Sequence, residues 1–348
     1  LKALVESAFT ANLDLEGQFR IKFDECGNCP FQTDDKLCLI QKELGAEYLS
    51  RVCKVYPRRR FVTREAIYRC CNTSCPVTIK ELLNNKNSMD LINLPAPPDQ
   101  ADKIYVANDN SVLKYRGDLI EFYYELISDK KIPVESALIL GALAAQKLTE
   151  IAANKQYKMI PEALKAFRKQ FHNAAQLKSI ENIKSNYHLK FGFLAEIIEK
   201  VILNGAVVLL RDETGTLNID LYNKGEQRMH EMLKDRDFFL RNLALNMLFE
   251  LAVPLKFSEK TIFENYSLFV AAFGCLKLNL IAVCSTEMNI NFRTFGQAFK
   301  YIGDNKLIGM SAIICRGICQ SDEKARNIIA RMNENKFTTP AYLALLVK

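Results

Sequence analysis

Residues 26–58 read CGNCPFQTDDKLCLIQKELGAEYLSRVCKVYPR, and a second run at residues 69–76 reads RCCNTSCP. Seven of the eleven cysteines of this 348-residue chain lie in these two runs: Cys26, Cys29, Cys38, Cys53, Cys70, Cys71 and Cys75. Where no secretory leader is recognised, cysteines at this density are more often metal ligands than disulfide partners. The two runs therefore predict a thiolate metal or iron–sulfur site, with the remaining chain as its scaffold.

The spacing of these cysteines leaves the identity of the metal open. A single C-x-x-C pair, Cys26 and Cys29, is shared by redox sites and zinc knuckles, and no second pair follows at the spacing of a zinc ribbon. Four thiolates would satisfy the tetrahedral preference of zinc, and irregularly spaced thiolates on loops suit an iron–sulfur cluster equally well. The alternative is a set of buried free cysteines, which are common core residues. Cys70 and Cys71 are the least suited to one site, because adjacent side chains usually diverge.

Composition and charge limit the class of protein. Apolar residues make up 49% and charged residues 25% of the chain, which is ordinary for a soluble globular protein. The net charge of +7 is not gathered into a basic stripe, so nucleic-acid binding is not predicted. The longest apolar stretch, residues 268–284, is interrupted by Lys277 and Asn279 and predicts a buried helix, so no membrane association is expected. Because no secretory leader follows Leu1, we expect the protein to lie in the cytoplasm. We also expect the sequence given to begin inside a longer one.

The order of apolar residues predicts a mainly α fold. The first 14 residues and residues 39–50 have helical spacing, residues 18–23 alternate like one strand, and Pro76 opens a short helix to Leu83. From about residue 116 the period is 3.6 residues, with a helix opened by Pro133 and further helices at 160–175, 178–203, 224–234, 236–252, 258–285, 292–302, 306–319, 322–333 and near 340. The exception is a hairpin predicted over residues 207–221, around Gly215. Asparagine- and proline-rich residues 84–103 break both periods, so we predict a cysteine-rich module with little β structure at residues 1–90, a linker at 91–115 and a larger helical domain at 116–348.

Five short pieces of the sequence carry a resemblance to a known family. In order they are Cys29-Pro-Phe, Leu37-Cys38, Leu44-Gly45, Cys53-Lys-Val-Tyr-Pro-Arg58 and Ser74-Cys75-Pro76. Their order and spacing over about residues 20–83 resemble the flagellin lysine N-methylase family, a branch of the cysteine-rich proteins that chelate zinc or iron. Weaker similarities are Arg116-Gly-Asp-Leu-Ile and Phe263-Glu-Asn-Tyr266.

The resemblance implies an enzyme that methylates lysine side chains of flagellin, uses S-adenosylmethionine and holds a 4Fe-4S cluster with cysteines. Cys29, Cys38, Cys53 and Cys75 match cysteines of the family, whereas Cys26 lies outside its usual pattern. Family members usually carry an earlier cysteine cluster followed by a tryptophan. This chain has no tryptophan and no cysteine before Cys26, so the earlier cluster is missing from it.

Two further groups of residues are candidates for binding and catalysis. Tyr56 could stack on the adenine of S-adenosylmethionine and Arg58 could pair with its carboxylate, although a packed tyrosine and a solvated turn are the alternatives. Glu264 and Tyr266 are candidates for the base that takes a proton from the lysine amine, with helix-surface and packing roles as the alternative. No glycine-rich turn of the common nucleotide-binding kind is present, so a doubly wound methyltransferase domain is not expected.

Two other functions compete with methylation. In the first, the cysteines hold zinc and the helical domain is a non-enzymatic or redox-responsive scaffold that binds a partner. In the second, weaker one, an iron–sulfur site would serve electron transfer.

Cys315 and Cys319, one helical turn apart, are predicted to pack in the core, because isoleucines flank them.

Overall fold

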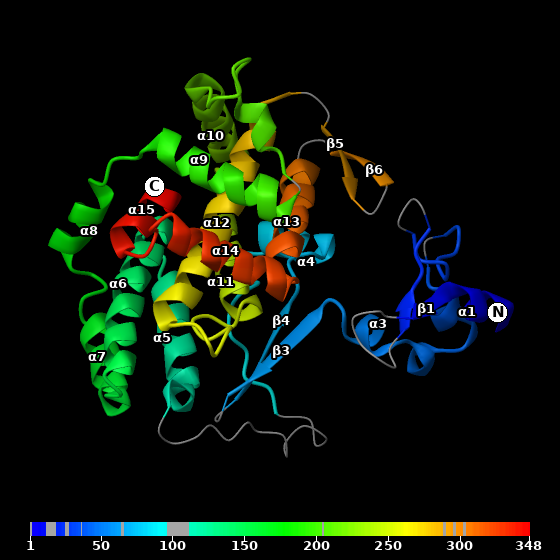
Figure 1. Ribbon diagram of the computed structural model, residues 1–348, viewed down its shortest axis with the longest axis horizontal. Coiled ribbons are helices and arrows are strands. Elements are labelled where there is room, and N and C mark those ends of the chain that lie inside the picture. The colour runs from blue at the N-terminus through cyan, green and yellow to red at the C-terminus, as the bar shows by residue number, and fades with distance from the viewer. Residues whose placement is uncertain are drawn as a thin grey trace. The chain divides into compact units, whose positions relative to one another are not determined.

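The computed structural model describes residues 2–11, 19–24, 28–35, 37–63, 66–95, 111–203, 205–287, 290–294, 297–301 and 304–348 (Figure 1). The chain divides into two compact units. We call Leu1–Tyr56 with Met288–Gly303 the N-terminal unit, and Pro57–Glu287 with Asp304–Lys348 the helical unit. The predicted linker at 91–115 lies mostly on residues outside the described ones, so the predicted domain division stays a prediction.

The N-terminal unit consists of short elements. They are α1 (Lys2–Ala8), β1 (Phe9–Ala11), β2 (Phe19–Ile21), α2 (Leu39–Glu43), a 3-10 turn (Ala46–Tyr48), α3 (Arg51–Val55), β5 (Ile290–Thr294) and β6 (Gln297–Tyr301). Strands β1 and β2 pair antiparallel, as do β5 and β6. The helix predicted over residues 39–50 is broken at Gly45, whose φ of 106° lies in the region that favours glycine. The helix predicted over the first 14 residues ends at Ala8, where β1 begins.

The helix predicted over residues 292–302 is wrong, because the chain forms the β5–β6 hairpin there. The register sets Phe292 opposite Phe299 and Ile290 opposite Tyr301, so strand-forming residues occupy paired positions. β-Branched and aromatic residues favour strands, and here this preference overrides the helical spacing.

The N-terminal unit has a small apolar core. Among its described side chains only Ala8 and Phe31 are buried, and the Phe31 ring lies 6.1 Å from that of Phe9. Units of this size bury too little apolar surface for stability from hydrophobic packing alone, and natural examples usually add a metal or disulfides.

The helical unit begins with a hairpin that the sequence pattern did not reveal. Strands β3 (Arg58–Val62) and β4 (Ile67–Cys71) pair antiparallel with Phe61 opposite Tyr68, and α4 (Pro76–Asn84) follows as predicted. The rings of Phe61 and Tyr68 stack on each other and on Phe249, which explains why this polar stretch folds as strands. Arginines at positions 58–60 and 69 mask the alternation of apolar residues.

The remaining chain is helical, so the prediction of a mainly α fold is confirmed. The helices are α5 (Arg116–Ser128), α6 (Val134–Ala153), α7 (Ile160–Arg168), α8 (Ala174–Glu181), α9 (Tyr187–Ile197), α10 (Ile219–Leu233), α11 (Phe238–Glu250), α12 (Ile262–Cys284), α13 (Asp304–Cys319), α14 (Asp322–Glu334) and α15 (Pro340–Val347). Short 3-10 and π turns complete the unit: Val112–Tyr115, Tyr157–Met159, Ile198–Ile202 and Val207–Leu210.

Helix α12 lies at the centre of the helical unit, with α6, α10, α13, α14 and α15 packed around it (Figure 1). All its side chains except Glu264 are buried. Helices α6 and α12 are long and apolar enough to cross a membrane by length and composition alone, but the whole apolar window of α12 is buried inside the protein. Burial accounts for its apolar composition, as in the core helix of a globular protein.

The hairpin predicted over residues 207–221 is wrong in its strands. Residues Val207–Leu210 form a 3-10 turn, and one bridge joins Arg211 to Leu217 before α10 begins at Ile219. Between them the chain turns at Gly215, with φ of 82°, and the Asp212 carboxylate accepts hydrogen bonds from Thr214 and Thr216. The predicted turn is thus present, but local hydrogen bonds to Asp212 replace the ladder.

Candidate functional site

Cys29, Cys38 and Cys53 lie on one small loop-and-helix segment of the N-terminal unit. The Gln32 amide donates a hydrogen bond to the Cys29 carbonyl at 2.9 Å, and Gln32 pairs with Cys38 in an isolated bridge. The loop therefore turns back, so that Cys38 directly precedes α2. Cys53 lies within α3, where its amide donates to the Ser50 hydroxyl at 3.3 Å.

The thiols of Cys38 and Cys53 each lie close enough to the Cys29 thiol to act on it. The Cys29 pKa is raised, first by burial and then by repulsion from the thiols of Cys38 and Cys53, against a hydrogen bond from the Phe31 backbone. Cys29 and Cys38 are half-buried and Cys53 is exposed. Three of the four cysteines that the family resemblance singles out therefore gather in one unit, at its surface.

Cys75 belongs to the helical unit, where it precedes α4. Its backbone, with φ of −87° and ψ of 118°, nearly repeats that of Cys38 before α2, at −89° and 118°. Each cysteine thus has its side chain at the start of a helix. That Cys75 joins the other three cysteines stays a prediction, and Cys26 lies outside the described residues.

A preformed metal site is not present among the residues that the structure describes. No group of three or more histidine, cysteine, aspartate or glutamate side chains in this part of the chain is arranged to hold a metal ion. The donor type fits zinc or an iron–sulfur cluster, since thiolates bind both. The arrangement does not close around an ion, so the metal site stays a prediction.

The other cysteines of the helical unit occupy a different environment. Cys275, Cys315 and Cys319 are at most 1% exposed, which confirms the predicted core position of the last two. Burial raises the Cys275 pKa far above its ordinary value, and the Cys319 pKa is raised by a hydrogen bond with Cys315 and by burial. On β4, burial and the nearby Glu250 carboxylate raise the Cys70 pKa to about 12. Thiols that stay protonated are weak nucleophiles and weak metal ligands.

The two residues predicted to bind the cofactor fall on opposite sides of the division between units. Tyr56 ends α3 in the N-terminal unit, with 44% of its surface exposed. Arg58 is exposed and begins β3 in the helical unit, in register with Cys71. The Cys71 pKa is raised by burial and by the neighbouring Cys75 thiol, and the positive charge of Arg58 offsets part of this rise. The neighbouring Arg59 donates to the Cys319 carbonyl at 3.1 Å, so this arginine has a structural partner.

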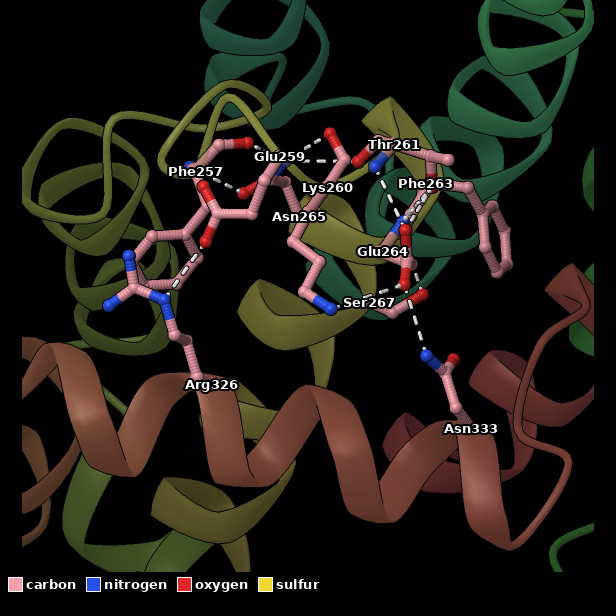
Figure 2. A network of polar contacts seen from close by, with 10 residues as sticks. All are labelled: Phe257, Glu259, Lys260, Thr261, Phe263, Glu264, Asn265, Ser267, Arg326 and Asn333. Atoms are coloured by element: carbon pink, nitrogen blue, oxygen red, sulfur yellow. Dashed lines mark hydrogen bonds and ion pairs between the residues drawn. The ribbon is translucent and has the colours of Figure 1, made fainter.

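Glu264 and Tyr266 have structural roles, and Figure 2 shows the contacts of Glu264. The Glu264 carboxylate accepts hydrogen bonds from the amide and hydroxyl of Thr261, both at 2.9 Å, and from Asn333 at 3.0 Å. Thr261 and Glu264 form a capping box at the start of α12. Partial burial raises the Glu264 pKa, but these hydrogen bonds outweigh it and the net shift is downward. The buried Tyr266 hydroxyl donates to the Leu138 carbonyl at 2.9 Å. A capping carboxylate and a phenol buried in the core are poorly placed to accept a proton from a substrate.

A shallow hollow of about 380 Å³ opens beside the C-terminal end of α12. Its lining residues are Leu209, Leu221, Lys224, Ser285, Thr286 and Glu287. None of the residues predicted to act in binding or catalysis lies among them, and we assign it no function.

One set of residues near the cysteines was missed at the sequence level. Asn242, Asn246 and Glu250 lie four residues apart along α11 and are at most 3% exposed. We call these three side chains the polar stripe. Polar residues spaced by four in an otherwise apolar helix share one face, so this signal was present in the sequence.

The polar stripe holds the backbone of the segment that carries Cys71 and Cys75. The Asn246 side chain donates to the Cys71 carbonyl at 2.8 Å, and one Glu250 oxygen accepts from the Thr73 amide at 3.0 Å and from the Thr73 hydroxyl. The Asn242 amide group donates to the carbonyls of Leu82 and Asn85, both at 3.1 Å, and to the Ser88 hydroxyl at 3.0 Å.

Comparison with known proteins identifies relatives in flagellar biosynthesis. A 65-residue stretch is 35% identical to the flagellar biosynthetic protein FliU of Salmonella muenchen, and covers 19% of this chain and 38% of the relative. An equal match, with the same length and identity, is found to a lysine-N-methylase of Salmonella typhimurium and covers 16% of that protein. The matched stretch thus spans well under half of these relatives. No solved structure matches the chain.

The chain matches the family model of the FliB lysine N-methylase C-terminal domain over residues 121–346. This match confirms the family that the cysteine motifs predicted, and it rests on a part of the chain that lies C-terminal to those motifs. Since the match extends over more than half of the sequence, the chain belongs to the FliB lysine N-methylase family.

Proposed function

We propose that this protein transfers methyl groups from S-adenosylmethionine to lysine side chains of flagellin, in the cytoplasm. The observation that carries the proposal is the match of residues 121–346 to the lysine N-methylase C-terminal domain. The names of two relatives, a lysine-N-methylase and a flagellar biosynthetic protein, support lysine as the acceptor and flagellin as the substrate.

The reaction requires an unprotonated amine. The lysine nitrogen forms a bond to the methyl carbon while the sulfonium bond of the cofactor breaks, which leaves S-adenosylhomocysteine and releases a proton. An ammonium group has no lone pair, so it must first lose its proton to a base or in a desolvating pocket. Glu264 and Tyr266 are excluded from this role by their contacts, and we assign the base to no residue.

For the cofactor we propose two separate contacts. The exposed ring of Tyr56 would stack on the adenine, and the exposed Arg58 guanidinium would pair with the carboxylate of the methionine part. Arginine suits this task because its planar group can donate two parallel hydrogen bonds to a carboxylate.

We propose further that Cys29, Cys38, Cys53 and Cys75 hold a 4Fe-4S cluster, with zinc as the alternative. Two observations support a metal: three of these thiols interact, and the N-terminal unit buries only Ala8 and Phe31 among its described side chains. A bound cluster would cross-link the loops that carry the thiols, which offsets the small apolar core. Iron and sulfide in stoichiometric amounts in brown protein would support the cluster, whereas colourless protein with zinc would support the alternative.

The decisive experiment is mass spectrometry of flagellin co-expressed with this chain. We expect lysines heavier by one or more methyl groups, and we expect the modification to disappear with Cys53→Ala while a Cys275→Ala chain retains it. Unmodified flagellin in the presence of the intact, folded chain would contradict the proposal and favour a zinc-binding scaffold that recognises a partner without methylating it.

A further inference from the structure

The polar stripe of α11 is aimed at the main chain of a single segment. Glu250 and Asn246 together bind backbone groups of Cys71 and Thr73, and Asn242 binds the carbonyl of Leu82 in α4 and that of Asn85 directly after it. Buried side chains of α11 thus hold the backbone of Cys71 and of Thr73, and Cys75 follows Thr73 by two residues.

The cysteine turn itself has little internal support. Between Cys71 and Cys75, the Cys75 amide donates to the Asn72 carbonyl at 3.1 Å, and the Asn72 amide donates to the Pro57 carbonyl at 2.6 Å. A further bond joins the side-chain amide of Gln320, which directly follows α13, to the Ser74 hydroxyl. Side chains of α11 and the residue after α13 therefore contribute to the position of the turn.

Polar residues are a costly way to dock a segment. A buried amide or carboxyl loses its hydration, and an apolar face of the same shape would dock with a smaller penalty. Hydrogen bonds to particular backbone groups fix the position of the segment along the helix, because an amide or carboxylate accepts few partner positions. The main effect of three such residues is therefore to specify where the segment lies on α11, and their contribution to the strength of its attachment is smaller.

We propose that Glu250 and Asn246 are positioning residues that fix the Cys71–Cys75 turn, and with it the thiols of Cys71 and Cys75, in their working arrangement. The inference rests on the proposed function insofar as Cys75 is taken as a metal ligand. The thiols of Cys71 and Cys75 lie close enough to repel each other, so the turn determines their separation as well as their exposure. Burial raises the pKa of Glu250, and its second oxygen is buried without a hydrogen-bond partner among the described residues.

The test measures the alkylation rate of each cysteine in the full chain. Purified protein is treated with iodoacetamide in a buffer with a reductant and a chelator, and modification is followed for each cysteine-containing peptide by mass spectrometry. With Glu250→Leu we expect alkylation of Cys71 and Cys75 to accelerate about tenfold, because the Thr73 amide and hydroxyl lose their buried acceptor. Glu250→Gln keeps a carbonyl oxygen as acceptor and should restore rates to within about twofold of the unaltered chain.

Three controls separate positioning from loss of stability. The rate at Cys275, which is fully buried in α12, reports opening of the whole unit and should stay unchanged in Glu250→Leu. Asn265→Leu removes a buried amide of α12 that binds residues 257–261, and it should leave Cys71 and Cys75 unaffected. Thr73→Val removes only the hydroxyl contact and should give a smaller acceleration at the same two cysteines, which keeps the test available if Glu250→Leu does not fold.

Unchanged rates at Cys71 and Cys75 in folded Glu250→Leu, or an equal acceleration at Cys275, would overturn the inference. Neither readout depends on flagellin or on methyl transfer. A chain that shows the expected alkylation pattern but leaves flagellin unmodified would therefore uphold the positioning role and contradict the proposed function.

Discussion

The thiols of the N-terminal unit and the core thiols of the helical unit lie in different environments. In the N-terminal unit, Cys29, Cys38 and Cys53 are half-buried or exposed, and the last two lie close enough to act on the Cys29 thiol. In the helical unit, Cys275 and Cys319 are enclosed by packed helices that keep their thiols protonated. The difference teaches that a thiol becomes a ligand or a core residue according to what the surrounding chain buries, since desolvation disfavours the thiolate.

The two units also differ in the size of their apolar cores. All but one of the side chains of helix α12 are buried, whereas among the described side chains of the N-terminal unit only those of Ala8 and Phe31 are buried. The helical unit should therefore be stable on its own packing, and the N-terminal unit should depend on what its thiols bind.

The largest expected effect tests the stability of the helical unit. Phe273 is fully buried in α12. Phe273→Ala should lower the free energy of unfolding by about 3–5 kcal/mol, because a large cavity forms in a packed core. Denaturant unfolding followed by circular dichroism measures this loss. Phe23→Ala, at a residue that is 54% exposed, is the control and should change the free energy by less than about 0.5 kcal/mol. Equal effects of the two variants would remove the contrast between the units.

The second prediction compares single thiols. At pH 8 a thiol with a pKa of about 12 is ionised in only about one molecule in ten thousand, so iodoacetamide should modify Cys70 about a hundredfold more slowly than the exposed Cys53. Peptide mass spectrometry of the reduced, metal-free chain gives both rates. Denaturation in urea is the control, because it should bring the two rates together. Similar rates in the folded chain would show that Cys70 is not set apart from the N-terminal thiols.

The third prediction concerns a buried amine of the helical unit. Lys190 is 3% exposed and donates to the Tyr222 hydroxyl at 2.8 Å, and burial together with the charge of Lys277 lowers its pKa to about 8. Between about pH 8 and pH 10.5 the unfolded chain therefore binds the proton that the folded chain has lost, so stability rises with pH through this window. The gain should be about 2–3 kcal/mol and should vanish in Lys190→Met.

The measurement is the free energy of unfolding at several pH values for the two chains. Lys200→Met, at an exposed lysine on the same stretch of helix, is the matched control and should keep the rise. A rise of equal size in Lys190→Met would assign the pH dependence to other groups.

The smallest expected effect concerns a residue that the sequence offered as a catalytic base. Glu264→Ala removes the acceptor of the capping box at the start of α12 and should cost about 1 kcal/mol of stability. Methylation of flagellin by the folded variant should continue, because the Glu264 carboxylate is held by hydrogen bonds from Thr261 and Asn333. Loss of methylation without loss of stability would return Glu264 to the list of catalytic candidates.

Much of the fold could be predicted where the signal is local. Pro76 marked the start of α4, and the apolar spacing marked most helices after residue 116. The errors arose where local spacing was ambiguous: Gly45 breaks one predicted helix, and aromatic residues with helical spacing form the β5–β6 hairpin. The β3–β4 hairpin was missed because its strands are stabilised by Phe249, which is remote in sequence.

The candidate site was predictable in its residue types and not in its grouping. Seven cysteines within fifty residues suggested one site; Cys29, Cys38 and Cys53 lie in one unit and Cys70, Cys71 and Cys75 in the other, and a site that joins Cys75 to the first three stays a prediction. The polar stripe on α11 had a visible spacing, but nothing in the spacing said which backbone groups it would bind.

By itself the sequence determined the supply of thiols, the helices and the family, because these depend on residue type and on neighbours within about four positions along the chain. Only the tertiary structure decided which thiols are exposed and what holds the turn before α4. Glu250 binds Thr73 across 177 positions of sequence, and burial of this kind arises when distant helices pack together and exclude water from the groups between them.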